Sequence, residues 1–479
     1  MQNRREFIQS LIIGGTTLSL FPNLALGQSQ GPWDWIYPQI LARIKPPKFK
    51  KKDYLITKFG AVGDGKTLNT QAIAKAIDEC NKKGGGRVVV PKGEFVTGAI
   101  HLKSNVNLYV SKGATLKFSK DGKDYLPVVH TRFEGMECMN HSPMIYAYEQ
   151  ENVAITGEGT LDGQSKESFW KWHGSPNYGG DPKVISQKPD RDKLYKMMQD
   201  GVSYQQRIFG EGHYLRMNFI QPYKCKNVLI EGVKIVDSPM WEVHPVLCEN
   251  VIVRGLSIVS HGPNNDGCDP ESCKDVLIEN CLFDTGDDCI AIKSGRNEDG
   301  RRINVPTENI IVRGCTMKDG HGGVTVGSEI SGGVRNLFVE NCNMDSPDLW
   351  NAFRVKNNAS RGGLLENFYF RNVTIGEVSN AIITIDFNYE EGRKGGFTPV
   401  MRNFVVENVT SKKSKYAMDA QGFENAPIYG LKVKNCTFDN VESGAIADNL
   451  KDSSLENVRI NGKIINDINT VKVAPPKKG

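Results

Sequence analysis

The sequence predicts an all-β protein, a right-handed parallel β-helix with one helix capping its N-terminal end. Three observations support this prediction. A short phrase recurs at intervals of 23 to 36 residues, each copy alternates apolar and polar residues as a strand does, and no amphipathic helix separates the copies. Strands of this kind cannot bury a face alone, so successive repeats must stack as coils.

Most copies begin with asparagine or aspartate and carry valine, isoleucine or leucine at alternating positions. They are NVAITGEGT at Asn152, NVLIEGVKI at Asn227, NVIVRGLSI at Asn250, DVLIENCLF at Asp275, NIIVRGCTM at Asn309, NLFVENCNM at Asn336, NFYFRNVTI at Asn367, NFVVENVTS at Asn403 and GLKVKNCTF at Gly430. We expect roughly one coil per repeat, with the corner asparagines hydrogen-bonded along the stack.

The two ends of the chain differ from this repeating part. Arg4-Arg5 precede a short apolar run, and Ala25 and Gly27 supply small residues for cleavage, so residues 1–27 resemble a twin-arginine export signal. We therefore expect an exported protein, periplasmic or secreted. The rest of the chain would then divide into three parts: an N-terminal extension over 28–52, a single β-helix domain over 53–470 and a tail over 471–479.

Composition limits the partners and the disulfides. A net charge of +5 is too small to argue for a nucleic-acid partner, and no segment is long and apolar enough for stable membrane insertion. The eleven cysteines are an odd number, and four of them share one place in the repeat (Cys281, Cys315, Cys342 and Cys436). Such spacing favours a stack of buried thiols with few disulfides. The oligomeric state cannot be read from the sequence.

Residues 60–67 match the phosphate-loop pattern G-x-x-x-x-G-K-[ST]. That motif needs parallel strands alternating with helices, and only one such helix follows here. This helix suits the open end of the β-helix, where bare strand edges would otherwise invite aggregation. We therefore expect no nucleotide partner and no cofactor.

Acidic residues and a histidine recur in register across neighbouring repeats. Asp287 follows Asp275 by 12 positions and His321 follows Asn309 by 12, which places them about 4.8 Å apart if the coils pair as adjacent strands. Asp266 precedes Asp287 by 21 residues, close to one coil, and Asp288 is adjacent to it. Asp287 and Asp288 can both face the cleft only if the chain bends at Gly286.

Cations are expected beside these carboxylates. In CIAIK, Ile290 and Ile292 should point inward, leaving Lys293 on the outer face, and in FRVK the outward residues are Arg354 and Lys356. Arginine holds a carboxylate through two parallel hydrogen bonds, and lysine adds a point charge. The cluster therefore predicts a groove for an anionic sugar.

Two other interpretations of the acidic residues remain open. Aspartate and glycine make turns at many β-helix corners, although four clusters in register favour function. Grouped carboxylates also bind calcium, but no EF-hand spacing is present, and NEDG at Asn297 is typical of an ordinary loop. We expect no metal site. The cluster suits hydrolysis of a glycosidic bond, because crowded carboxyls keep at least one proton.

These residues resemble the polygalacturonases of glycoside hydrolase family 28. The family motifs N-x-D-G, G-D-D, G-H-G and R-x-K appear in order as NNDG, GDD, GHG and RVK, where the usual N-T-D-G reads N-N-D-G. The resemblance covers roughly residues 54–460 and extends to the glycine-rich entry segment. It implies a pectin-lyase-like β-helix, hydrolysis of α-linked galacturonate bonds in pectin with inversion, and a pectic polysaccharide or oligogalacturonide as partner.

The resemblance also implies roles for individual residues. Asp287 would be the general acid, and Asp266 and Asp288 would activate the attacking water. His321 would tune the proton of the acid. Arg354 and Lys356 would hold the uronate carboxylate, with Tyr389 lining the sugar site.

A long, irregular insertion around residues 123–223 should cover one end of the groove. Similar loops in the family accompany exo action, which we therefore expect. Trp170 and Trp172 suit either packing or sugar stacking. The alternatives are a hydrolase of rhamnogalacturonan or another branched pectin, a pectate-lyase-type eliminase, and a non-catalytic carbohydrate binder.

Overall fold

The computed structural model describes residues 31–468, and these contain a parallel β-helix. Two compact units share the chain, one up to Gln39 and one from Ile40 onward. Helix α1 (Pro32–Arg43) spans the boundary, and every strand belongs to the second unit. The predicted signal over residues 1–27 and the tail over 471–479 lie outside the described residues. No helix among residues 31–468 has the length and apolar character that a membrane crossing requires.

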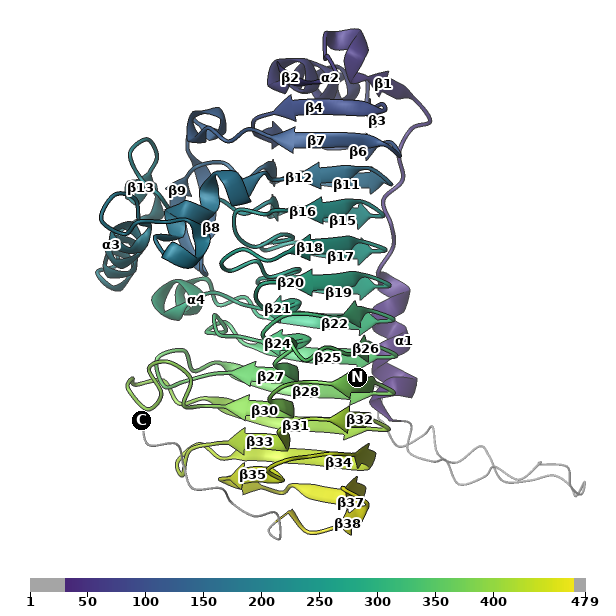
Figure 1. Ribbon diagram of the computed structural model, residues 1–479, viewed down its shortest axis with the longest axis vertical. Coiled ribbons are helices and arrows are strands. Elements are labelled where there is room, and N and C mark those ends of the chain that lie inside the picture. Colours follow the sequence, from purple (N-terminus) through teal and green to yellow (C-terminus); the bar gives the residue numbers. More distant parts are fainter. Residues whose placement is uncertain (1–30, 469–479) are drawn as a thin grey trace, which may run out of the picture. The chain divides into compact units, whose positions relative to one another are not determined.

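Strands of the second unit stack as three parallel rows, and most coils contribute one strand to each row (Figure 1). The first row is β1 (Asp53–Leu55), β3 (Gly86–Val90), β6 (Val106–Val110), β11 (Glu151–Gly157), β15 (Lys226–Glu231), β17 (Glu249–Arg254), β19 (Lys274–Glu279), β22 (Thr307–Arg313), β25 (Val334–Glu340), β28 (Leu364–Arg371), β31 (Val400–Glu407), β34 (Ile428–Phe438) and β37 (Ser454–Ile460). This row contains the predicted repeat phrase.

The second row follows the first along the chain. It is β2 (Asp64–Leu68), β4 (Gly93–Thr97), β7 (Ala114–Phe118), β12 (Thr160–Asp162), β16 (Lys234–Val236), β18 (Ser257–Ser260), β20 (Leu282–Thr285), β23 (Thr316–Met317), β26 (Asn343–Met344), β29 (Thr374–Glu377) and β32 (Thr410–Lys413). Two short strands, β36 (Leu450–Lys451) and β38 (Lys463–Ile465), complete the sheet near its end, where β38 runs antiparallel to β37.

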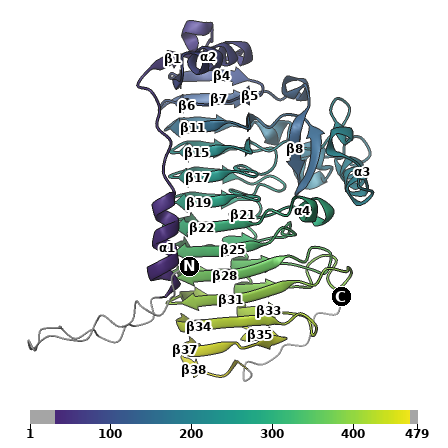
Figure 2. The ribbon, with the colours of Figure 1, turned by 180° about the vertical axis from the view of Figure 1, so that it is seen from behind.

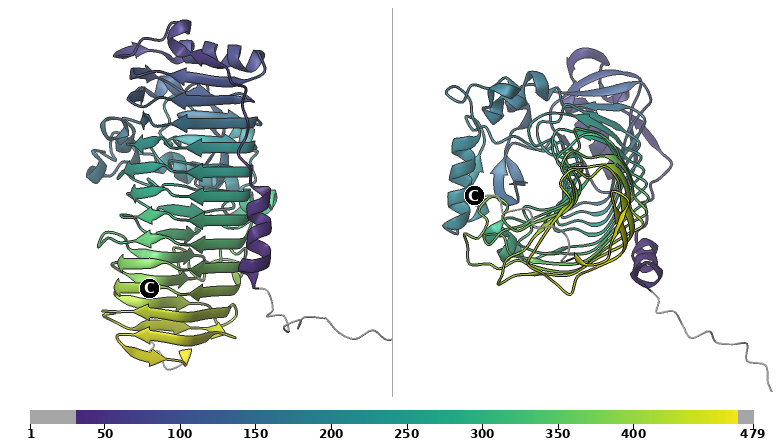
Figure 3. Two further views of the ribbon diagram at one scale, coloured as in Figure 1. Left: turned by 90° about the vertical axis from the view of Figure 1, so that its right-hand side faces the viewer. Right: turned by 60° about the horizontal axis from the view of Figure 1, so that its bottom comes forward.

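The third row consists of two sheets joined by single bridges. It is β5 (Ile100–His101), β10 (Ile145–Tyr148), β14 (Ile220–Tyr223), β21 (Ile290–Ile292), β24 (Val324–Val326), β27 (Asn351–Lys356), β30 (Ala381–Asp386), β33 (Tyr416–Gln421) and β35 (Ala445–Asp448). Single bridges from Ile220 to Val243, from Val243 to Cys268 and from Cys268 to Ile290 carry the register across the gap. Seen obliquely from the C-terminal end of the stack, the rows curve around one interior (Figure 3, right).

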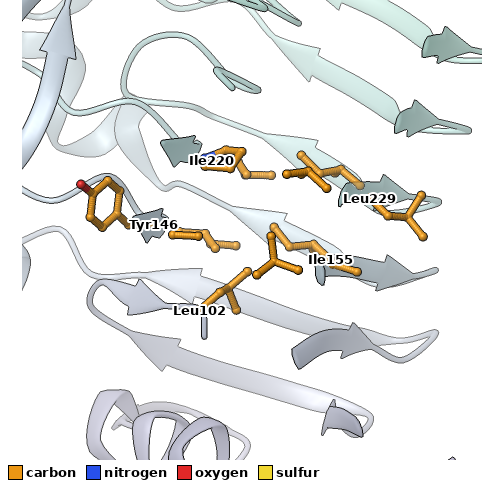
Figure 4. A pocket seen from close by; sticks show the side chains of 12 residues that line it. Leu102, Tyr146, Ile155, Ile220 and Leu229 are labelled. Atoms are coloured by element: carbon orange, nitrogen blue, oxygen red, sulfur yellow. The ribbon is translucent and has the colours of Figure 1, made fainter. Parts of the chain in front are cut away.

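That interior is apolar and closely packed. All eleven cysteines are buried and free, as the thiol-stack prediction requires. A small cavity of about 10 Å³ lies among apolar side chains that include Leu102, Ile155 and Ile220 (Figure 4). A cavity of this size lined by apolar groups offers no hydrogen-bond partner to a water molecule.

Helix α2 (Thr70–Lys82) covers the N-terminal end of the stack and buries Ile73, Ala76 and Ile77, as predicted. Residues 60–67, which match the phosphate-loop pattern, use two of their backbone donors within the loop itself. The Asp64 carboxylate accepts hydrogen bonds from the backbone N–H groups of Lys66 and Thr67 at 2.9 and 2.8 Å.

The predicted irregular insertion over 123–223 is more ordered than expected. One complete coil, β10 to β12, lies within it and separates two excursions. The first contains the antiparallel pair β8 (Val129–Phe133) and β9 (Met136–Asn140), which β13 (Ile208–Phe209) joins. The second contains helix α3 (Lys188–Gln199), and both excursions lie on one side of the stack (Figure 2).

A second local prediction was wrong. NEDG is not an ordinary loop but opens the short helix α4 (Asn297–Ile303). Asn297, the first residue of this helix, is buried and donates a hydrogen bond from its side-chain amide to the Tyr195 hydroxyl at 2.9 Å. The contact with α3 therefore stabilises a helix that its sequence alone does not indicate.

Corner asparagines form the expected ladder. Asn309 donates to Asp275 at 2.9 Å and accepts from Asn336 at 3.0 Å, and its φ of 61° lies in the left-handed region. Asparagine tolerates this conformation better than most residues, and its side chain satisfies both neighbouring coils.

We expect Asn309→Gly to lower the free energy of unfolding by about 1–2 kcal/mol through the two lost hydrogen bonds. Asn309→Ala should cost about 1 kcal/mol more, because alanine is strained in the left-handed region. Urea unfolding followed by circular dichroism measures both. Wild-type midpoints for the two variants would show that the ladder contributes nothing.

Candidate active site

The predicted site residues meet beside the third row of strands. Ile290 of β21 pairs with Val324 of β24, and Asp287 and His321 each lie three positions before them. The register inferred from the repeats is therefore present, and the His321 Nδ1 atom lies 2.8 Å from the Asp287 Oδ1 atom.

Asp266 and Asp288 complete a three-carboxylate cluster. Cys268 pairs with Ile290, so Asp266 and Asp288 occupy equivalent places on successive coils. One oxygen from each of Asp266, Asp287 and Asp288 lies within 4.8 Å of the others. The expected bend is present, because a Cβ at Gly286 would lie 2.6 Å from the Gly262 carbonyl oxygen. Only glycine permits this close approach of the two loops.

Each carboxylate has its own basic neighbour. Lys356 donates to Asp288 at 2.6 Å, and Lys293 lies 3.6 Å from Asp266, while His321 serves Asp287. The Thr325 hydroxyl donates to the second oxygen of Asp288 at 2.8 Å. These groups already compensate the negative charge that would otherwise favour a calcium ion.

Protons are distributed unequally over the cluster. Burial, together with the charges of Asp269 and Asp287, raises the pKa of Asp266 well above its ordinary value. Burial also acts to raise the pKa of Asp287, but the hydrogen bond and charge of His321 outweigh it and hold that pKa at about 2. Burial lowers the pKa of His321, yet Asp287 reverses the shift and raises it. The pair thus carries its proton on His321.

A buried polar network supports the cluster from behind. Lys293 is on the site side of its strand, as its alternation predicts, but it is almost fully buried at 2% exposure. Its ammonium lies 3.5 Å from Asp269, 3.2 Å from Glu329 and 4.4 Å from the Trp241 ring. The sequence placed Lys293 on the outer face, but it did not indicate Asp269, Glu329 or Trp241 as its neighbours. The second aspartate of NNDGCD was the available signal for Asp269.

An aromatic platform was also missed. Trp350 precedes β27 and stacks on the His321 ring, with centroids 4.0 Å apart and an interplanar angle of 24°. Trp350 remains 49% exposed and lines the pocket that holds the cluster. Trp350 lies in the same phase as His321, three positions before Phe353, so the repeat register could have identified it.

The cations predicted to bind substrate are in place. Arg354 lies 3.7 Å from Asp288, and the Tyr389 ring centroid lies 5.7 Å from the guanidinium of Arg354 and 5.5 Å from the ammonium of Lys356. Trp170 and Trp172 are both buried, and the Trp170 indole donates to the Ser238 carbonyl oxygen at 2.7 Å. The structure assigns these two tryptophans to packing.

The cluster lies in a pocket of about 360 Å³, within the size range of small-ligand sites. Its far wall consists of charged side chains from separate parts of the chain: Glu134 after β8, Arg191 of α3, Arg296 before α4, and Glu390. Both excursions therefore help to close the pocket.

Comparisons with known proteins agree with this geometry. The model of glycosyl hydrolases family 28 matches residues 211–461, and a model described as rhamnogalacturonase A/epimerase, pectate lyase-like matches residues 55–158. An exopolygalacturonase from Thermotoga maritima has a similar structure, with 45% identity, a TM-score of 0.87, and coverage of 89% of this chain and 96% of that one.

Two further relatives extend the likeness. An exo-poly-alpha-D-galacturonosidase from Dickeya chrysanthemi is 27% identical over 462 residues, which cover 86% of this chain and 74% of the relative. The family 28 exopolygalacturonase from Yersinia enterocolitica shares the fold, with 24% identity, a TM-score of 0.70, and coverage of 86% and 76%. With four family motifs joined in one cleft and a family model that matches more than half of its length, this chain belongs to family 28 of the glycosyl hydrolases.

Proposed function

We propose that the protein is an exo-acting polygalacturonase that releases galacturonate from the end of a pectic chain. The observation that supports exo action is that charged side chains from both excursions line the pocket together with the carboxylates, where they would block a longer chain. The names of the Thermotoga and Dickeya relatives agree with it. An anionic sugar suits the cleft because Arg354 and Lys356 lie at its edge with Tyr389.

Catalysis proceeds by a single displacement. Asp287 protonates the leaving oxygen, and Asp288 and Asp266 together activate the water that attacks the anomeric carbon. Asp288 accepts the proton of this water, whereas Asp266, which burial keeps protonated, orients it. The low pKa of Asp287 in the free enzyme means that its proton resides on His321 at 2.8 Å and must return as the bond breaks. Departure of a negatively charged alkoxide favours that return.

We also propose export, on the grounds of the Arg4-Arg5 motif and the small residues at Ala25 and Gly27. Exported enzyme would meet pectic chains outside the cytoplasm. Fractionation of expressing cells tests this directly, and finding the protein confined to the cytoplasm would refute it.

A product time course on de-esterified polygalacturonate, with a chelator present, tests the activity. We expect galacturonate monomer to appear first and without unsaturated uronide. Mixed oligomers at early times would indicate endo action, and unsaturated product would indicate an eliminase. If the enzyme does not cleave polygalacturonate but cleaves a branched pectin, its substrate is rhamnogalacturonan or a related backbone.

Asp287→Asn should reduce kcat about 10²-fold or more, because general-acid assistance is lost. Asparagine has nearly the same shape, so the melting temperature should stay close to that of the wild type. A rate above about a tenth of wild type, which corresponds to only about 1.4 kcal/mol of barrier, would contradict the assignment of Asp287 as the acid.

The alkaline limb of the kcat profile should report the proton shared by Asp287 and His321. That proton is present at low pH and is lost as pH rises through the pKa of His321, which Asp287 raises above 6.5 against the effect of burial. In His321→Gln a carboxyl alone must hold the proton, so the limb should move to lower pH and kcat should fall. An unmoved limb would place the controlling proton elsewhere.

A further inference from the structure

The far wall of the active-site pocket is a partition between two cavities. On its other side lies a chamber of about 730 Å³, larger than the pocket itself. Arg191, Arg296 and Glu390 line both the pocket and this chamber. These three residues therefore border both volumes.

We propose that Arg191 and Glu390 are specificity-determining residues, which limit the released product to one sugar by closing the pocket against a chamber that would take a second uronate. This proposal rests on the proposed exo action and adds the residues that set product length. Neither Arg191 nor Glu390 belongs to the catalytic residues predicted from the sequence.

Ion pairs hold the partition closed. Glu134 accepts from Arg191 at 2.7 Å and from Arg296 at 2.8 Å. Glu390 lies 3.0 Å from Arg361 and 3.6 Å from Arg296. Arg296 is almost fully buried, whereas the Arg191 and Glu390 side chains are 40% and 39% exposed. The two outer members can therefore be removed with less disturbance than the inner one.

The chamber has the chemistry of an acidic-sugar site. Besides the shared residues, its lining includes Lys196, Lys394 and the ring of Tyr195. Cations suit a uronate carboxylate, and an aromatic ring suits the apolar face of a sugar. Its volume lies within the range of small-ligand sites. The far side of the partition thus offers room and charge for one more galacturonate unit.

The double variant Arg191→Ala with Glu390→Ala opens the partition and leaves the inner charges paired. Glu134 keeps Arg296 at 2.8 Å, and Arg361 keeps Glu391 at 3.4 Å. Arg296 also remains 3.6 Å from Glu329. The catalytic carboxylates retain their own partners, so chemistry should continue.

The test is chromatography of early products from heptagalacturonate, comparing wild type and double variant at equal turnover. We expect digalacturonate to rise from a trace to more than about a tenth of the released product. At that fraction, binding that releases monomer is favoured about tenfold over binding that releases dimer, which corresponds to only about 1.4 kcal/mol. If the double variant folds poorly, the single variant Arg191→Ala replaces it in the test. This variant should show a smaller rise in digalacturonate.

Lys196→Ala with Lys394→Ala is the matched control, because both lysines line the chamber but not the pocket. It should still release only monomer. Folded, active partition variants that release only monomer would overturn the proposal. A wild type that itself releases mixed oligomers would overturn the exo assignment as well, whereas a monomer-only wild type with unchanged variants would overturn the partition alone.

Discussion

Parallel pairing of each strand with its counterpart one coil later is the constraint on which the site depends. Backbone hydrogen bonds fix the spacing of the coils at about 4.8 Å, so residues in equivalent places on successive coils must face one another. Asp266 meets Asp288 by this rule, and Asp287 meets His321. Residues far apart in sequence become neighbours because the loops that carry them lead directly into paired positions of the third row, and the corner ladder at Asn309 supports the same register.

Rigid placement lets the cleft hold more negative charge than flexible side chains would tolerate. The cost of crowding three carboxylates is offset locally: Lys356 compensates Asp288, His321 compensates Asp287, and burial keeps a proton on Asp266. These environments push the pKa values of neighbouring carboxyls apart, with Asp266 raised and Asp287 lowered. The proton on His321 links the resting state to the acid role proposed for Asp287.

The sequence predicted those features that have a period. The repeat phrase indicated the coils, the helical spacing after residue 69 indicated the capping helix, and the equal offsets of Asp287 and His321 indicated their contact. Trp350 shares that phase and was overlooked because tryptophan is not an acid–base residue. Glu134 and Arg191 come from excursions without a period, so only tertiary structure shows that they close the pocket. Helix α4 depends on its contact with α3, which local sequence does not record.

The central claim is that the three carboxylates hydrolyse the bond in one displacement, with water attacking from the face opposite the leaving group. Proton NMR of the first galacturonate released, recorded before mutarotation, tests this most directly. The account predicts the β-anomer from an α-linked substrate, because a single displacement inverts the anomeric carbon. The α-anomer as first product would contradict it, since retention requires a covalent intermediate on one of these aspartates.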